Sequence, residues 1–268
     1  MPNDAIELAI DQGVLTVTLN RPEVHNAIDG GMVAMLAAAL DQADRDDAVR
    51  IFCLRANGPS FSAGIDIKAA AVVQQSGQGT GDVEALTHAI FRLARLSKPS
   101  IAMVTGPAYG AGVGLVAACD FVLATAAMRL AVTQVRHGLV AGLVAPLLAE
   151  AIGLRAARQH ALSAQPIDAA RALQLGLISE ISDPAAIDQH LASLIGNLQR
   201  GGPAALAETN ALLNAHGGRP VDTEALADIA VRVARQRAHG EAREGMAAFR
   251  EKRPPAWIGD AVANPNQL

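Results

Sequence analysis

The chain has 268 residues, of which 51% are hydrophobic, and a formal net charge of -4. A chain of this length and apolar content can bury a large core in one compact domain, with or without an appendage. The negative charge argues against a general nucleic-acid surface but is compatible with a local basic patch for a phosphorylated ligand. The apolar runs are too short or too broken by glycine and proline to span a bilayer, and no secretory signal is visible, so we expect a cytoplasmic protein.

The first part of the chain predicts a sheet that helices cover. Gly13 turns an opening hairpin whose second arm, residues 15–19, alternates apolar side chains with threonine, as half-buried strands do. Residues 51–54 and 100–104 are continuously apolar, which indicates strands covered on both faces by strand-helix-strand crossovers. We therefore expect an α/β fold, with helices over residues 32–43 and 84–96.

The later part of the chain is predicted to be helical. After about residue 140 alanine-rich segments of helical period follow one another to the end. Pro203 is expected to open one helix that ends at Gly217, and Asp222 is expected to cap another. Residues 74–82 and 259–268 have the composition of flexible segments.

The two cysteines, Cys53 and Cys119, each lie in an apolar stretch. This placement favours buried, inert thiols over a disulfide, a metal site or a nucleophile. No group of residues has the spacing of metal ligands, so no metal is expected.

Two glycine-containing segments carry the strongest functional signal, FSAGIDIK at residues 61–68 and GPAYGAGVGLVAACD at residues 106–120. Each leads into a predicted helix start, where backbone N–H groups lack partners and can hold an anion. Two such donors on one oxygen would stabilise an enolate formed at a thioester. Either segment alone is weak, because small residues at a helix start often serve packing. The dinucleotide fingerprint fails because Leu115 stands at its final glycine, and no phosphate-loop lysine follows.

Taken together, these segments resemble the crotonase superfamily, also called the enoyl-CoA hydratase/isomerase family, over nearly the whole chain. LVAACD and LVAPLLAEAIG are most similar to the branch that contains methylglutaconyl-CoA hydratase. Five signatures occur in the family's order: LNRPEVHNA (19–27), FSAGIDIK (61–68), KPSIAMVTGPAYGAGVGLVAACDF (98–121), QVRHGLVAG (134–142) and AREGMAAFREKRPPAW (242–257).

The resemblance implies a crotonase-like spiral of ββα units over residues 1–200. Residues 201–268 would then form a helical segment for packing into trimers or dimers of trimers. It implies an acyl-CoA or enoyl-CoA thioester as substrate, no permanently bound cofactor, and neither a nucleic acid nor a membrane as partner.

The resemblance also assigns roles to single residues. The backbone N–H groups of Ile65 and Ala111 would be the oxyanion donors. For Lys68 and Lys252 a solvated surface lysine is the alternative, for Phe249 a buried helix anchor, and for Asp66 a structural hydrogen-bond acceptor. The residues expected at the CoA moiety are Val24, Ala63, Asp66, Ile67, Lys68, Phe249 and Lys252.

The two glutamates that manage water in hydratases of this family are absent. Gly114 occupies the first position, as in the methylglutaconyl-like branch, and Gln134 occupies the second. Glutamine can orient a water but cannot accept its proton near neutral pH, so hydration by the usual route should be slow. The aspartate that isomerases often carry is also absent, since Ala141 and Gly142 stand there.

Several titratable residues lie near these signatures and could take over the role of the absent glutamates. Packing or hydrogen-bonding roles are favoured for the ones closest to the two glycine segments and to Gln134. Two hypotheses follow: an acyl-CoA enzyme with weak or altered hydratase or isomerase chemistry, or a non-catalytic acyl-CoA binding or carrier protein. The candidates are Tyr109, His88, His137, Asp66 and Glu150.

Overall fold

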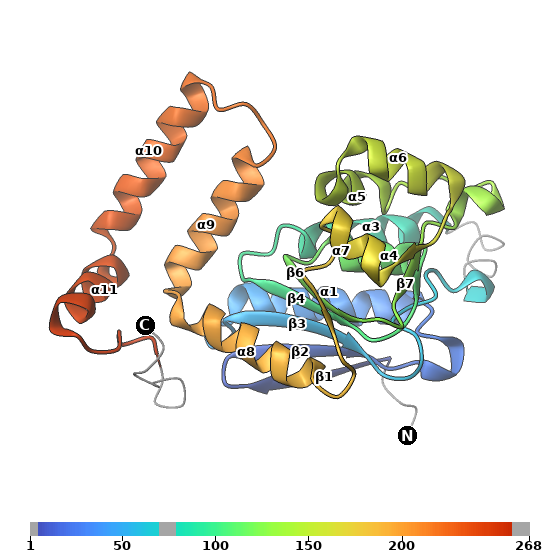
Figure 1. The fold of residues 1–268 in the computed structure, drawn as a ribbon, viewed down its shortest axis with the longest axis horizontal. Coiled ribbons are helices and arrows are strands. Elements are labelled where there is room, and N and C mark those ends of the chain that lie inside the picture. Colours follow the sequence, from blue (N-terminus) through green and yellow to red (C-terminus); the bar gives the residue numbers. More distant parts are fainter. Residues whose placement is uncertain (1–4, 70–78, 259–268) are drawn as a thin grey trace. The chain divides into compact units, whose positions relative to one another are not determined.

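The computed structural model describes residues 5–69 and 79–258 (Figure 1). Packing divides them into two units, which are described separately. The first runs to Leu191 without residues 97–99, and the second contains residues 97–99 and everything from Ala192 onward. The boundary predicted from the sequence, between residues 200 and 201, stays a prediction.

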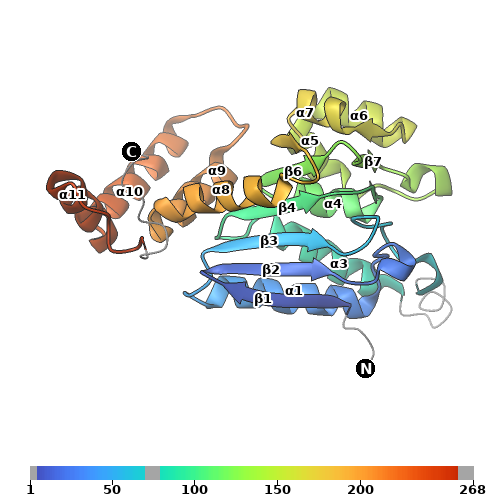
Figure 2. The ribbon, with the colours of Figure 1, turned by 60° about the horizontal axis from the view of Figure 1, so that its bottom comes forward.

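A six-stranded sheet forms the centre of the first unit, in the order β1-β2-β3-β4-β6-β9. Figure 2 shows the part of this sheet from β1 to β6. β1 and β2 pair antiparallel around the predicted turn at Gly13, and the other neighbours pair parallel. The predicted hairpin and parallel strands are thus confirmed. The strands are β1 (Ile6–Asp11), β2 (Val14–Leu19), β3 (Ile51–Ala56), β4 (Ser100–Val104), β6 (Phe121–Thr125) and β9 (Glu180–Ser182).

A second, three-stranded sheet has the order β5-β7-β8. It consists of β5 (Ala108–Tyr109), β7 (Arg129–Ala131) and β8 (Ile167–Asp168). These strands are two or three residues long, too short for an alternating pattern to show in the sequence. They matter for function because β5 lies within the second glycine-containing segment and leads directly into its glycines at residues 110–114.

Helices cover the large sheet of the first unit. The predicted helix over residues 32–43 lies within α1 (Gly30–Arg45), which Asp29 caps by accepting a hydrogen bond from the Met32 N–H at 2.8 Å. α3 (Gly79–Leu93) packs beside α1. The unit also contains η1 (Pro22–Val24), α4 (Ala111–Ala117), η2 (Gln134–His137), α5 (Ala145–Ile152), α6 (Leu154–Ser163) and α7 (Ala169–Leu175).

Two local expectations need correction. β2 is buried along nearly its whole length rather than on alternate residues, because it is an interior strand flanked by β1 and β3. Residues 79–82, predicted to be flexible, form the start of α3, which ends at Leu93 rather than at Leu96. The other residues predicted to be flexible, 74–78 and 259–268, lie outside the described residues.

The second unit is helical, as predicted. α9 (Pro203–His216) begins at the predicted proline, and α10 (Thr223–Ala238) is capped by Asp222, which accepts a hydrogen bond from the Ala225 N–H at 2.9 Å. α11 (Gly240–Glu251) follows, and α8 (Ile187–Arg200) leads into the unit. Its predicted role in oligomer formation stays a prediction. Within the described part of the chain, no helix is long and apolar enough to cross a membrane.

Candidate functional site

The first signature, residues 19–27, forms a tight loop that supports the first glycine segment. His25 and Asn26 both adopt the left-handed conformation, with φ of 55° and 53°. Asn26 is fully buried; its Oδ1 accepts a hydrogen bond from the Arg21 N–H at 2.7 Å, and its Nδ2 donates to the carbonyls of Asn57 and Ser60, each at 2.9 Å. These bonds hold a strained loop in place against residues 57–63.

The backbone of Ile65 presents a free donor. Ile28 and Ile65 form an isolated parallel bridge: the Ile28 N–H donates to the Gly64 carbonyl at 2.7 Å, and the Asp66 N–H donates to the Ile28 carbonyl at 2.9 Å. In a parallel bridge the N–H of the middle residue points to the opposite side. Within residues 5–69 and 79–258 the Ile65 N–H has no acceptor.

The start of α4 presents a second free donor. β5 is held in place because the Tyr109 N–H donates to the Ser62 carbonyl at 2.8 Å and the Gly110 N–H donates to the Ala131 carbonyl at 3.0 Å. The Ala111 N–H is the first of α4 and has no acceptor in the described part of the chain. The predicted exposure of N–H groups at both segments is therefore present.

Gly64 brings the two donors together. A Cβ atom at this position would lie 2.8 Å from the Tyr109 carbonyl oxygen and 3.3 Å from the Ala111 nitrogen, and its φ is +88°. Both the close approach and the positive φ require glycine. The N–H groups of Ile65 and Ala111 therefore lie at the junction of the two segments, which are far apart in the sequence.

Gln134 lies beside the same junction, at the beginning of η2. Its Nε2 would be 3.7 Å from a Cβ atom on Gly110. Its Oε1 is buried, and no donor among the described residues reaches it. A buried carbonyl oxygen without a donor is costly, so this oxygen is available to a hydrogen-bond donor of a ligand.

The position of the other missing acid is closed. A Cβ atom on Gly114 would lie 2.9 Å from the Leu143 carbonyl oxygen, 3.3 Å from Ile90 Cδ1 and 3.5 Å from Val144 Cγ2. A side chain here would have to displace backbone atoms. The packing of α4 against residues 143–144 thus leaves no space for an acidic side chain at residue 114.

Asp66 is engaged within the protein. Its carboxylate accepts hydrogen bonds from the backbone N–H groups of Lys68 at 3.1 Å and Ala69 at 3.2 Å, and it pairs with Arg21 at 3.3 Å. The bond from Ala69, helped by Arg21, lowers the pKa of Asp66. Asp66 is therefore a structural hydrogen-bond acceptor, and its expected contact with CoA stays a prediction.

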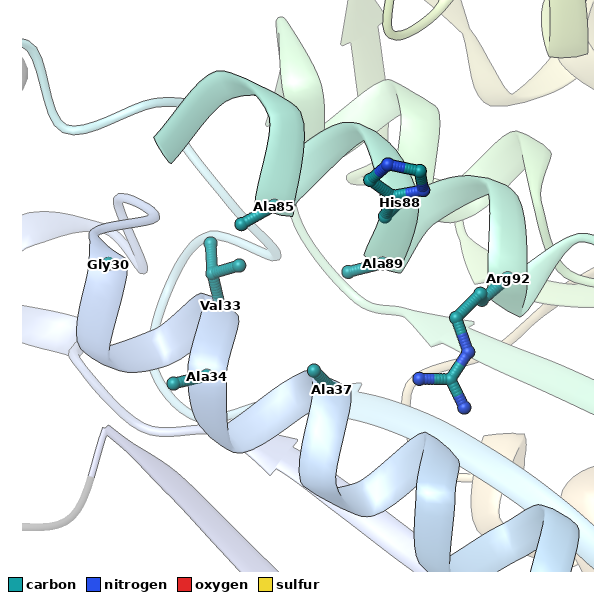
Figure 3. A pocket seen from close by; sticks show the side chains of 8 residues that line it. All are labelled: Gly30, Val33, Ala34, Ala37, Ala85, His88, Ala89 and Arg92. Carbon is teal, nitrogen blue, oxygen red and sulfur yellow. The ribbon is translucent and has the colours of Figure 1, made fainter. Parts of the chain in front are cut away.

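The other titratable candidates lie in different surroundings. Glu150 pairs with Arg95 at 3.1 Å, and Nδ1 of the exposed His137 lies 3.2 Å from the Thr133 carbonyl oxygen. His88 lies 3.7 Å from Glu84 and lines a groove of about 260 Å³ between α1 and α3 (Figure 3). Tyr109 is half-buried in β5.

The residues expected at CoA are largely exposed. Ala63, Lys68 and Lys252 are exposed, and Val24 and Ile67 expose 37% and 71% of their surfaces. The alternative of a buried anchor is wrong for Phe249, which is 82% exposed. Their contacts with CoA stay predictions.

The two cysteines are free thiols. Cys53 is buried, and burial raises the pKa of its thiol to about 11. Cys119 is half-buried and also free, and its Sγ donates to the Leu115 carbonyl. The described residues contain no group of three or more His, Cys, Asp or Glu side chains that could hold a metal ion.

Sequence reasoning missed two contributors to this region. One is Asn26, whose burial follows from pairing with residues 57–60, far along the chain. The other is the Leu143 carbonyl, which lies just before α5 and receives no hydrogen bond from the described residues.

The chain is similar to known proteins over nearly its whole length. Residues 9–260 match the family model described as "Enoyl-CoA hydratase/isomerase". A Thermus thermophilus protein named "Putative enoyl-CoA hydratase" is 34% identical over 250 residues, covering 91% of this chain and 97% of the relative. The mitochondrial methylglutaconyl-CoA hydratase of Mus musculus is 29% identical over 257 residues, covering 93% and 81%.

The fold is also similar to that of solved structures. The crystal structure of an enoyl-CoA hydratase from Shewanella pealeana superimposes with a TM-score of 0.90 at 31% sequence identity, over 94% of this chain and 96% of that one.

Proposed function

The chain belongs to the enoyl-CoA hydratase/isomerase family of enzymes, and we propose that it binds an acyl-CoA thioester and holds the thioester oxygen with the N–H groups of Ile65 and Ala111. The crotonase-like α/β fold expected from the sequence is confirmed by the likeness to solved members. The oxyanion role of these two residues, and everything finer below, is proposed.

One observation carries the proposal. Two backbone N–H groups from segments far apart in the sequence have no acceptor in the part of the chain that the structure describes, and they lie close to Gly64, where a Cβ atom would be 3.3 Å from the Ala111 nitrogen. Donors held in this way need no reorganisation when negative charge develops on the thioester oxygen. Removing one donor from such a pair typically costs about 10²–10³ in kcat.

Hydration is proposed to be weak or altered. Gln134 can accept a hydrogen bond from water but cannot remove its proton, and Gly114 offers no side chain. A positioned carboxylate typically contributes about 10²–10⁴ to the rate, and Asp66 cannot replace one because Arg21 and two N–H groups already bind it. The thioester is therefore polarised where proton transfer is poorly supported.

The substrate is proposed to be an enoyl-CoA, with 3-methylglutaconyl-CoA as the first compound to try because a relative is named for it. Exposed Lys68 is proposed to meet the CoA phosphates, and Val24, Ala63 and Ile67 to line the ligand's path. Phe249 and Lys252 of the second unit are proposed to serve the same ligand in a trimer or dimer of trimers. A cytoplasmic location completes the proposal.

The decisive variant removes one donor without a change of fold. Ala111→Pro deletes the N–H at the first position of α4, where proline fits a helix. We expect kcat/KM for the best enoyl-CoA to fall by about 10²–10³, while free CoA, which lacks the acyl carbonyl, binds as before.

Leu154→Pro is the matched control, because Leu154 is exposed and is also the first residue of a helix after a glycine. It should leave kcat/KM unchanged. Equal losses in the two variants would contradict the oxyanion role.

A non-catalytic acyl-CoA binding or carrier protein is the alternative, favoured by the absence of acids at residues 114 and 134. Calorimetric titration with an acyl-CoA and with free CoA separates the cases when combined with turnover assays. Tight ester binding without turnover by the wild type or by Gln134→Glu would favour the carrier, and failure to bind either ligand would refute both functions.

A further inference from the structure

Leu143 is a buried residue just before α5, and its backbone carbonyl has no hydrogen-bond donor among the described residues. The N–H groups of Val144 and Ala145 both donate to the Ala141 carbonyl, at 3.1 and 2.8 Å, and the Leu148 N–H donates to the Val144 carbonyl at 2.9 Å. No donor in the described part of the chain reaches the Leu143 oxygen, although Leu143 is only 7% exposed.

Two features explain why the Leu143 carbonyl has no donor. The residue three positions after Leu143 is Pro146, which has no N–H to donate. α5 begins at Ala145, after Leu143, so its regular hydrogen bonds do not include this carbonyl. A buried carbonyl without a donor is destabilising, and such groups usually meet a ligand or a water.

The Leu143 carbonyl oxygen lies beside the position that the Cβ atom of a side chain at residue 114 would occupy. A Cβ atom on Gly114 would be 2.9 Å from the Leu143 oxygen, so this oxygen occupies the direction of a side chain at residue 114. A second oxygen without a donor among the described residues is Gln134 Oε1, whose side chain lies beside Gly110, four residues before Gly114. Two orphan acceptors thus border the helix start that carries the Ala111 N–H.

We propose that the Leu143 carbonyl oxygen accepts a hydrogen bond from the water that adds to the enoyl group, replacing a carboxylate at residue 114. This inference rests on the proposed function. The water oxygen bonds to C3, one of its protons passes to C2, and the C2=C3 π bond is consumed, so no further reactant is needed. The carbonyl orients the water and takes no proton from it.

The first test supplies the missing donor. Pro146→Ala restores an N–H three residues after Leu143, which can bond to the carbonyl and compete with water. We expect kcat for hydration to fall about tenfold while KM changes by less than about twofold. Pro203→Ala, in the first turn of α9, is the matched control and should leave kcat unchanged.

The second test moves the carbonyl. Gly114→Ala places a methyl group against the Leu143 oxygen and should also lower kcat by at least about tenfold. Gly196→Ala is the control, because Gly196 lies within α8 and a Cβ atom there meets nothing within 4 Å. If Gly114→Ala does not fold, Pro146→Ala decides.

The third test is structural. In crystals of the full chain with butyryl-CoA, we expect an ordered water about 2.8 Å from the Leu143 oxygen. A bound ester with no water or ligand donor at this carbonyl overturns the inference. Unchanged kcat in Pro146→Ala overturns it too and leaves the proposed function intact, whereas a wild type without hydration of any enoyl-CoA removes both.

Discussion

The two sides of the candidate site differ in how tightly they are packed. The donor side comprises residues 61–66 and 106–112, and the acceptor loop comprises residues 134–143. Cβ atoms on Gly64, Gly106 and Gly112 of the donor side would lie 2.8, 2.3 and 2.9 Å from neighbouring atoms, whereas nothing lies within 4 Å of such atoms on Gly138 and Gly142 of the acceptor loop.

This difference separates two tasks. At Gly64, Gly106 and Gly112 the donor side leaves no room for a side chain, so the backbone that carries the two proposed oxyanion donors is held in place. The acceptor loop has open space at Gly138 and Gly142. Under the proposed function, a substitution in the acceptor loop can therefore change proton chemistry while the two donors stay in place.

Gly64→Ala should have the largest effect on stability and turnover, because Gly64 lies in the closely packed donor side. The methyl group meets the Tyr109 carbonyl, and φ is +88°, so we expect a loss of about 3 kcal/mol in unfolding free energy. We also expect kcat/KM to fall about a hundredfold as the donors separate. Denaturant unfolding and enoyl-CoA kinetics measure both quantities.

Gly138→Ala is the matched control, since its φ of +70° is also positive but its surroundings are open. It should cost only about 1 kcal/mol and leave turnover nearly unchanged. Equal effects at the two glycines would break the contrast between tight and open sides.

Gln134→Glu should raise the rate of hydration by at least about tenfold, because a carboxylate can remove the water proton. The pH–rate profile should gain an acid limb, since the new base works only when deprotonated. Gln174→Glu, an added charge on an exposed residue, should change nothing. A silent Gln134→Glu variant that binds acyl-CoA tightly would favour a carrier.

Asp66→Asn should have a smaller effect, on stability. The wild-type pKa of Asp66 is lowered by the Ala69 N–H bond and by Arg21, so its contribution is present above the unfolded pKa and is lost as pH falls through the folded pKa. We expect a loss of about 1 kcal/mol at neutral pH and a flatter fall in stability below about pH 4.

Asp188→Asn is the control for this variant, because Asp188 is exposed and lies 3.8 Å from Arg55. The melting temperatures of both variants and the wild type are measured between pH 2 and 7, a range that includes the ordinary carboxyl pKa. A slope that is unchanged in Asp66→Asn would show that the bonds at Asp66 do not stabilise the donor side.

Alkylation of the thiols should have the smallest effect. Burial raises the pKa of Cys53 to about 11 and also raises that of Cys119, so little thiolate forms near neutral pH. Iodoacetamide at neutral pH should leave acyl-CoA turnover unchanged, and both thiols should react after unfolding in guanidinium. Rapid labelling of the folded chain with loss of turnover would contradict the buried, inert assignment.

Much of the donor side could be predicted from the sequence. The glycines of residues 61–68 and 106–120 mark close approaches and helix starts, and those are local properties of the backbone. The hairpin at Gly13, the helix beginning at Pro203 and the cap at Asp222 were predictable for the same reason, because each depends on residues adjacent in the chain.

The remaining features depend on contacts between distant residues. Asp66 is engaged by Arg21, 45 residues earlier, and the half-buried strand expected at residues 15–19 is covered because of its place in the sheet. The closure of Gly114 by Leu143 depends on the path of the acceptor loop, which no periodic pattern encodes. The short strands β5, β7 and β8 form through pairing alone.

The isolated bridge between Ser62 and Ala108 has a consequence for handling the protein. Since the two donors are joined only when this tertiary pairing exists, a thioester that contacts both binds the folded chain and not the unfolded one. Such a ligand raises the melting temperature in proportion to the logarithm of its concentration, by the equivalent of about 2.7 kcal/mol at a hundred times Kd. A thermal-shift screen of CoA esters can therefore rank acyl groups without any turnover.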